Sequence, residues 1–311
     1  MENNKKISNI AFIGSKRSGL ELLKIIHNFT KNVSVITFDD SADIRSNLNE
    51  FQQYAISENL PFYIAKNKKF FERILYELKP DICFVMGWYW IISEEILNSV
   101  PNGFIGIHYS LLPKYRGFSP LIWAIINGEK ESGYSIFSLN KGMDEGDIWL
   151  QKKIAIPQTA YINEIMELFE KDALNSFKEL LPGIINGSAK PYPQENIQPS
   201  YCKKRTPEDG KIDWEKNADE IYNFIRAQTA PYPGAFFFYN GKKITLNKAS
   251  QYKGEFKISS SDEPGKIIYK KENGVIVLCG ANSLLLIEEI NIDGVTKNPN
   301  KVFTDLNLIL S

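Results

Sequence analysis

One stretch, residues 103–147, decides how this chain is interpreted; it is GFIGIHYSLLPKYRGFSPLIWAIINGEKESGYSIFSLNKGMDEGD. It predicts a short apolar strand over 104–107, with His108 at its end and a Pro-containing turn that stops the strand. A helix follows, and then a strand over 134–139 leads into a Gly-rich acidic turn that holds Asp144. Ligands of open parallel sheets bind at the carboxyl ends of strands, so a histidine and an aspartate there suit acid and base chemistry. An ordinary histidine and a simple tight turn are the alternative interpretation.

The same stretch resembles the signature of the formyltetrahydrofolate-dependent formyltransferases. That signature is a strand with Asn-x-His, then x-Ser-Leu-Leu-Pro-x-Tyr-Arg-Gly, then an Asp-x-Gly turn. In this sequence the histidine is His108, the Ser-to-Gly run is residues 110–117 and the aspartate is Asp144. One position differs, because the residue two before the histidine, a catalytic Asn in the family, is Gly106 here.

The resemblance implies roles for individual residues. The catalytic pair would be His108 and Asp144, and the co-substrate would be 10-formyltetrahydrofolate, with no metal. The residues implied for binding the folate are Met86, Gly87, Trp88, Tyr89, Leu139 and Gly142. Those implied for binding the acceptor substrate are Ser110, Arg116, Gly117 and Tyr232.

Length and composition fit a globular protein of two domains. The chain has 311 residues, 43% of them hydrophobic and 24% charged, enough for two separate cores. Its 37 basic and 37 acidic residues balance, so nothing global favours a polyanion. The three cysteines (Cys83, Cys202, Cys279) show neither disulfide nor zinc spacing, which favours a reducing compartment. No apolar run has transmembrane length and the N-terminus lacks a signal-peptide pattern, so we expect a cytoplasmic protein without a membrane partner.

The N-terminal region predicts a Rossmann-like, mostly parallel sheet. An apolar strand over 7–13 leads into Gly14-Ser15-Lys16-Arg17-Ser18-Gly19 and a helix. Lys16 stands where the dinucleotide fingerprint needs its middle glycine. A dinucleotide oxidoreductase is therefore a weak alternative, despite Asp39 and Asp40 after the next strand.

Further elements follow from local periodicity. His27, late in the first helix, is predicted to cap it or lie at the surface. Three adjacent aromatic residues, Trp88 to Trp90, favour packing and ligand binding about equally, and the resemblance favours binding. The remaining predicted elements of this region are strands over 33–38 and 82–86 and helices over 66–78, after Ser93 and over 161–185.

Residues 187–200 contain three prolines and are interpreted as an interdomain linker. This divides the chain into a Rossmann-like catalytic domain, 1–200, and a C-terminal domain, 201–311. The segments 207–214 and 231–235 resemble those of formyltransferases that carry a C-terminal domain. Strand-like runs between 236 and 290 predict a small antiparallel barrel or sheet, and the resemblance implies an OB-like fold. The expected fold class is α/β with a smaller, mainly β C-terminal domain.

Formyl transfer needs an unprotonated amine, a polarised formyl carbonyl and a proton path to the leaving folate nitrogen. His108 can donate to the developing oxyanion or move protons, and Asp144 would orient its ring. In the family the Asn donates to the tetrahedral oxygen, an interaction worth roughly 3–4 kcal/mol in other oxyanion holes. With Gly106, the donor would be a backbone amide, a water, Tyr109 or Ser110. The loss also raises the alternative of a catalytically silent protein that binds folate or a nucleotide sugar.

Three classes of acceptor occur in the family. Glycinamide ribonucleotide formyltransferases resemble only the N-terminal part of this chain. Methionyl-tRNA formyltransferases have a basic insertion after the second strand, whereas residues 39–45 here are a short acidic segment that would repel phosphate. The resemblance therefore favours the nucleotide-sugar N-formyltransferases, with a UDP- or dTDP-linked amino-dideoxyhexose as partner rather than a nucleic acid. Methionyl-tRNA formyltransferase is the alternative, and a homodimer is left open.

Overall fold

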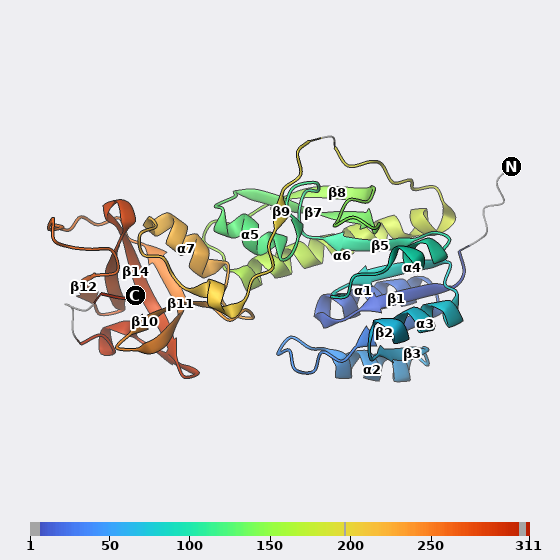
Figure 1. The fold of residues 1–311 in the computed structure, drawn as a ribbon, viewed down its shortest axis with the longest axis horizontal. Coiled ribbons are helices and arrows are strands. Elements are labelled where there is room, and N and C mark those ends of the chain that lie inside the picture. The colour runs from blue at the N-terminus through green and yellow to red at the C-terminus, as the bar shows by residue number, and fades with distance from the viewer. Residues whose placement is uncertain (1–6, 196, 305–308) are drawn as a thin grey trace. The chain divides into compact units, whose positions relative to one another are not determined.

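The structure, a computed structural model, describes residues 7–195, 197–304 and 309–311. The chain forms two compact units, and it passes between them more than once (Figure 1). Unit 1 consists of the chain up to Pro120, Ser132–Ile154 and Glu167–Cys202. Unit 2 consists of Leu121–Glu131, Ala155–Met166 and the chain from Lys203 onward.

A seven-stranded sheet organises unit 1, in the order β3-β2-β1-β4-β5-β7-β8. The first five strands in this order pair in parallel, which confirms the predicted Rossmann-like, mostly parallel sheet. β7 pairs antiparallel with β5. The strands are β1 Ile10–Gly14, β2 Val33–Phe38, β3 Phe62–Ala65, β4 Ile82–Met86, β5 Phe104–His108, β7 Glu131–Ser138 and β8 Ile148–Ala155. A separate two-stranded pair joins β6 Arg116–Gly117 to β9 Tyr201–Cys202.

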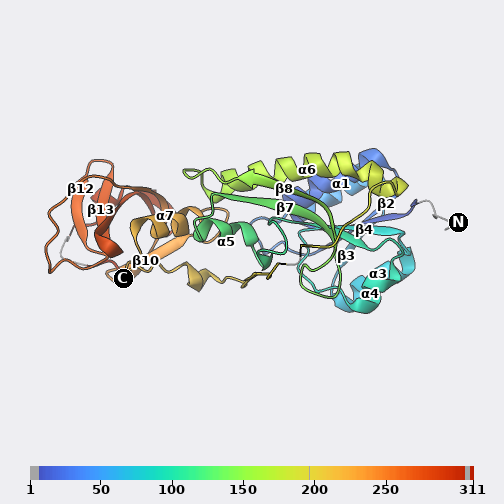
Figure 2. The same ribbon diagram turned by 90° about the horizontal axis from the view of Figure 1, so that it is seen from above.

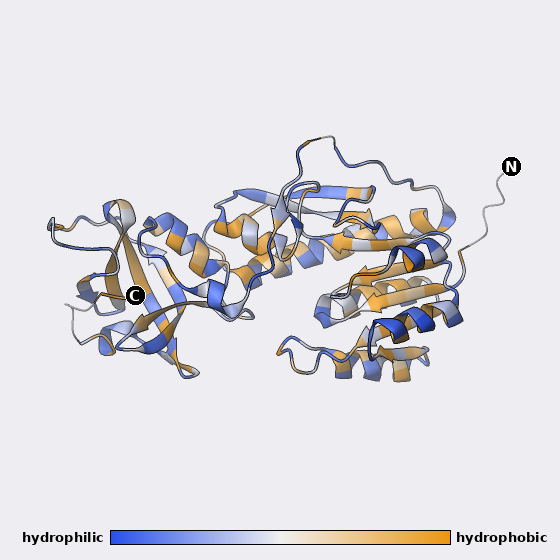
Figure 3. Ribbon diagram, in the orientation of Figure 1, coloured by the Kyte–Doolittle hydropathy of each residue, from blue (hydrophilic) through white to orange (hydrophobic). Residues whose placement is uncertain are grey.

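Helices cover both faces of this sheet, with α1 and α6 on one face and α3 and α4 on the other (Figure 2). The first face buries Leu23, Phe51 and Phe177, and the second buries Phe71, Ile74 and Ile96. The central strands are apolar along their length because both of their faces are covered, as the hydropathy colouring of Figure 3 shows. The helices are α1 Lys16–Phe29, α2 Leu48–Ser57, α3 Lys68–Leu78, α4 Glu94–Ser99 and α6 Ile162–Asn186.

His27 is buried, so its predicted place at the surface or as a helix cap is wrong. Its side chain is 2% exposed, and its Nδ1 lies 2.8 Å from the hydroxyl of Tyr54 on α2. Helix α2, which the sequence analysis did not predict, packs against α1 and covers it. Burial and the nearby charge of Lys31 lower the pKa of His27.

Unit 2 is built on a six-stranded antiparallel sheet, which confirms the predicted antiparallel, mainly β C-terminal domain. Its order is β10-β11-β14-β13-β12, and β15 pairs with β14. Helix α7 begins with a capping box, in which the side chains of Asn217 and Glu220 bond to each other's backbone N–H groups. The elements are α5 Pro120–Ile126, α7 Ala218–Arg226, β10 Ala235–Tyr239, β11 Lys242–Gln251, β12 Ile267–Lys271, β13 Gly274–Cys279, β14 Ser283–Ile292 and β15 Val295–Lys297. Across the described parts of both units, no helix is long and apolar enough to cross a lipid bilayer.

Backbone contacts join the turn after β1 to the loop after β4. The Ser15 N–H donates to the Met86 carbonyl at 3.1 Å, and the Ser15 hydroxyl donates to the Gly87 carbonyl at 2.8 Å. A Cβ on Gly14 would overlap the Met86 carbonyl oxygen. Gly14 is thus needed for close packing against β4, a role that requires no bound dinucleotide.

We expect Gly14→Ala to destabilise unit 1 by about 3 kcal/mol or more, because its new Cβ has no space beside β4. Gly103→Ala is the matched control. Gly103 directly precedes β5, and a Cβ there meets nothing within 4 Å, so this change costs only about 1–2 kcal/mol for a side chain at positive φ. Thermal unfolding followed by circular dichroism measures both. Equal melting temperatures for the two variants would contradict this role of Gly14.

Candidate active site

His108 is the last residue of β5 and its imidazole is held by one backbone group. Its Nε2 lies 2.8 Å from the carbonyl oxygen of Tyr115, which can only accept, so we place a hydrogen on Nε2. The ring is 9% exposed and meets Phe137 edge-on, with centroids 6.1 Å apart. The other nitrogen, Nδ1, is therefore the one available for proton uptake.

Asp144 lies next to His108, with its Oδ2 3.7 Å from the His108 Nδ1. The route by which it gets there differs from the prediction. Because β7 is antiparallel to β5, its last residue, Ser138, pairs with Ile105 near the start of β5. The expectation that the carboxyl ends of two parallel strands meet is wrong for this pair. The loop of residues 139–147 brings the carboxylate back to the histidine.

The backbone of residues 115–117 holds both members of the pair. The Tyr115 carbonyl accepts from His108, and the Gly117 N–H donates to the Asp144 Oδ2 at 2.7 Å. This conformation needs positive φ angles, +58° at Tyr115 and +98° at Gly117. A Cβ on Gly117 would lie 2.7 Å from the Cys202 carbonyl oxygen, so only glycine fits there. One short loop thus fixes the separation of the two side chains.

Gly106, in place of the family's Asn, faces the same side of the sheet as His108, since side chains alternate along a strand. A Cβ on Gly106 would lie 2.9 Å from Cδ1 of Leu139. Leu139 therefore fills the space beside the glycine. Of the side-chain donors considered in its place, Ser110 is fully buried and donates to the Lys114 carbonyl at 2.7 Å, and Tyr109 packs into the core on the opposite face.

The loop after β4 lies at the same edge of the sheet as His108, because β4 and β5 are parallel neighbours. The carbonyls of Met86 and Gly87 accept from Ser15. The Trp88 ring packs on Phe71, with centroids 4.6 Å apart, whereas Tyr89 is 55% exposed. The adjacent aromatic residues therefore divide between packing and exposure.

Three further residues that the resemblance implies for binding, Gly142, Arg116 and Tyr232, lie in different parts of the structure. The Gly142 N–H donates to the Asn140 side chain at 3.0 Å. The guanidinium of Arg116 is 9% exposed and bonds to side chains of unit 1. Tyr232 belongs to unit 2, where its hydroxyl lies 3.5 Å from the Met166 sulfur. Of the implied residues, Asp144 lies beside His108, Gly117 holds Asp144, and Leu139 lies beside Gly106 on the His108 strand.

Burial, reinforced by the charge of Asp144, raises the pKa of the Cys202 thiol to about 12. This thiol is thus protonated and unreactive at neutral pH. Within residues 7–195, 197–304 and 309–311, no three His, Cys, Asp or Glu side chains converge as a metal site.

The residues that support the two loops were not predicted from the sequence. Gln194, Ser200 and Tyr201 bond to residues of the 115–117 and 139–147 loops. No local signal identifies them, because a Pro-rich segment without periodicity does not indicate what it contacts.

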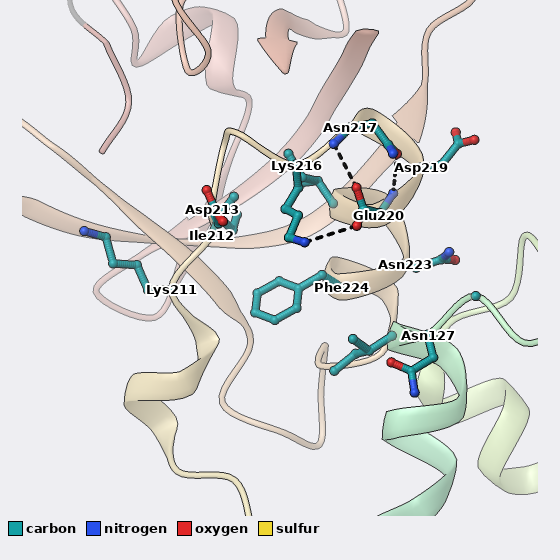
Figure 4. A pocket seen from close by; sticks show the side chains of 13 residues that line it. Asn127, Lys211, Ile212, Asp213, Lys216, Asn217, Asp219, Glu220, Asn223 and Phe224 are labelled. Carbon is teal, nitrogen blue, oxygen red and sulfur yellow. Dashed lines mark hydrogen bonds and ion pairs between the residues drawn. The ribbon is translucent and has the colours of Figure 1, made fainter. Parts of the chain in front are cut away.

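A cavity of about 670 Å³ lies in unit 2, between the end of α5 and the start of α7 (Figure 4). Among its charged groups, Lys216 pairs with Glu220 at 3.3 Å, and Asn217 and Glu220 form the helix cap. Phe224 supplies an apolar wall. It contains none of the residues around His108.

The chain is similar to known proteins over most of its length. Residues 9–181 match the family described as formyl transferase, and residues 204–304 match the formyl transferase C-terminal domain. A methionyl-tRNA formyltransferase of Caldanaerobacter subterraneus is 36% identical over 224 residues, which are 72% of this chain and 71% of that protein. The bifunctional polymyxin resistance protein ArnA of Wigglesworthia glossinidia brevipalpis is 35% identical over 260 residues, 83% of this chain and 39% of that protein. Among solved structures, an N-formyltransferase of Helicobacter canadensis in complex with folinic acid and dTDP-3-aminofucose has a TM-score of 0.71 at 21% identity, covering 90% of this chain and 99% of that one.

We expect Gly106→Asn to destabilise the protein by about 1–2 kcal/mol, because the new side chain displaces Leu139. Adding Leu139→Ala makes room for the amide, so the double variant should be more stable than the sum of the two single changes predicts. A double-mutant cycle of unfolding free energies measures this coupling. Additive effects would show that Leu139 does not fill the space beside Gly106.

Proposed function

The chain belongs to the formyl transferase family of enzymes, and from that premise we propose that it transfers the formyl group of 10-formyltetrahydrofolate to the amino group of a nucleotide-linked amino sugar. The acceptor we propose is a UDP- or dTDP-linked amino-dideoxyhexose. One observation carries the transfer chemistry. His108 and Asp144 lie 3.7 Å apart at a sheet edge, each held by a backbone group of the same loop.

This pair suits the proton movements of formyl transfer. The reaction joins the acceptor nitrogen to the formyl carbon and breaks the bond from that carbon to the folate N10. The acceptor nitrogen loses one proton, and N10 gains one. Because Nε2 of His108 donates to Tyr115, Nδ1 takes up the proton and later returns it. The Asp144 carboxylate beside Nδ1 stabilises the imidazolium that forms in between.

The loop after β4 is the part of the site that we propose for the folate. It lies beside His108 and exposes Tyr89 and Ile91, an apolar surface suited to a flat pterin ring. Packing of Trp88 on Phe71 and Phe38 holds this loop in place. We propose that residues 86–89, with Leu139 and Gly142, contact the folate. The Helicobacter canadensis enzyme of similar fold, solved with folinic acid, supports this proposal.

The charges after β2 support a sugar acceptor over tRNA. The Lys16 Nζ lies 2.6 Å from Asp40 and 2.9 Å from Asp43, and Arg45 lies 2.8 Å from Asp43. Burial opposes the charge of Lys16, but its two hydrogen bonds outweigh this and raise its pKa. The Arg45 hydrogen bond, with that of Lys16, lowers the pKa of Asp43. Both cations are thus neutralised within the loop, which leaves no excess positive charge there for a tRNA backbone.

Methionyl-tRNA formyltransferase is the second candidate, and the sequence relatives favour it. The relative at 36% identity carries that name, and its similarity extends over 72% of this chain. The two candidates share the formyl donor and the candidate catalytic pair, so only the acceptor distinguishes them.

We expect Asp144→Asn and His108→Asn each to lower kcat at least about a hundredfold, because both side chains act on protons in transfer. Asn at position 144 is close in shape to Asp and still accepts from the Gly117 N–H, so the fold should persist. Asp147→Asn, an exposed aspartate of the same loop, is the matched control and should keep the wild-type rate. Near wild-type turnover by either site variant would rule out this mechanism.

A panel of UDP- and dTDP-linked amino sugars and charged initiator tRNA, each with 10-formyltetrahydrofolate, tests the acceptor. We expect mass spectrometry to show the gain of one formyl group on a nucleotide sugar, with little change in KM between 50 and 200 mM salt. A tRNA enzyme should instead lose affinity steeply over that range. Faster formylation of the tRNA would overturn the sugar assignment. No transfer to any acceptor, with tight binding of 5-formyltetrahydrofolate, would identify a silent binding protein.

A further inference from the structure

The segment after α6 contacts both loops of the candidate site. We call residues 191–195 and 197–202 the strap. We call residues 139–147 the Asp144 loop. Near the start of the strap, the Tyr192 backbone pairs with Ile148, directly after this loop, through hydrogen bonds of 2.7 and 2.9 Å. At its end, Tyr201 and Cys202 pair in parallel with Arg116 and Gly117. The strap is thus bonded to the loop that carries Asp144 and to the loop that holds His108.

Gln194 of the strap bonds directly to the loop that carries Asp144. Its side-chain amide donates to the Asp144 carbonyl at 2.7 Å and to the Gly146 carbonyl at 2.9 Å. Its Oε1 accepts from the Arg116 Nη2 at 2.7 Å. All three contacts are within normal hydrogen-bond distance, so one amide joins the two loops.

Arg116 completes this connection. Its Nη1 donates to Glu145 at 3.3 Å and to the Tyr201 hydroxyl at 3.1 Å. The backbone N–H of Arg116 donates to the Ser200 carbonyl at 2.8 Å. The guanidinium is buried, and its Nη1 and Nη2 bond to the Asp144 loop and the strap. A buried charge held in this way costs much to displace.

We propose that Gln194, acting with Arg116 and the strap, positions the Asp144 carboxylate against His108. Gln194 is then a positioning residue for formyl transfer, and Arg116 acts through the Asp144 loop. This inference rests on the proposed function, in that it gives Asp144 a part in the reaction.

The Asp144 loop needs such support for a physical reason. It contains Gly142 and Gly146, and its residues 140, 141, 143, 145 and 147 are exposed, so little packing restrains it. The carbonyls of Asp144 itself and of Gly146, two residues further on, are the two groups that Gln194 binds. A shift of about 1 Å in a reacting group can cost about a hundredfold in rate. Loss of these two bonds would allow a shift of that size.

Three variants test the proposal. Gln194→Ala removes all contacts of the side chain. Gln194→Glu keeps an oxygen that accepts from Arg116 but cannot donate to the two carbonyls. Gln198→Ala, at an exposed glutamine of the same strap, is the matched control. The readouts are kcat and KM for formyl transfer, the affinity for 5-formyltetrahydrofolate, and the ring ¹⁵N signals of the histidines, of which the chain has only His27 and His108.

We expect Gln194→Ala and Gln194→Glu each to lower kcat about tenfold, with KM for the folate changed less than twofold. Both should move the ring signals of His108 and leave those of buried His27 in place, and Gln198→Ala should resemble the wild type. Wild-type kcat and His108 signals in folded Gln194→Ala would overturn the proposal, and so would wild-type behaviour of Gln194→Glu. The histidine signals need no acceptor. If the wild type transfers no formyl group, the proposed function fails, and these signals still show whether Gln194 positions Asp144.

Discussion

The site depends on the backbone of residues 115–117. Its Tyr115 carbonyl fixes the imidazole of His108, and its Gly117 N–H fixes the carboxylate of Asp144. Backbone groups are well suited to this, since they have no rotamers and their positions follow from the chain path alone. These positions require a loop with positive φ angles, and the pairing of β6 with β9 of the strap supports that loop.

Sheet topology explains where the site lies. Open α/β sheets usually bind ligands where the strand order reverses, here between β1 and β4. In this protein, hydrogen bonds from Ser15 to the carbonyls of Met86 and Gly87 join the two strand ends at that position. The candidate site lies one strand further, at the ends of β4 and β5. The antiparallel β7 then makes a returning loop necessary, and the strap supports that loop.

The exchange of the family's Asn for glycine also affects its surroundings. Leu139 packs beside Gly106 and next to Phe137, so this side of the site is apolar. A neutral side-chain donor is thus absent at this position, and His108 is the polar group on that face of β5. In apolar surroundings, the attraction between a His108 imidazolium and the Asp144 carboxylate is less screened by water than it would be at an exposed surface.

The sequence by itself determined the elements whose patterns are local. Strands β2 and β4 have their predicted bounds because runs of buried apolar residues mark them, and the start of α7 follows from the local pattern of its capping box. The sequence also identified His108 and Asp144 as chemically suited side chains. Only the tertiary structure decided the direction of β7, the burial of His27 and the contacts of Gln194. The contacts that build the site join residues far apart in the chain, such as Tyr115 and Ser200, which are separated by 85 positions. Periodicity within a segment carries no information about such a distant partner, because it reflects only which face of that segment is buried.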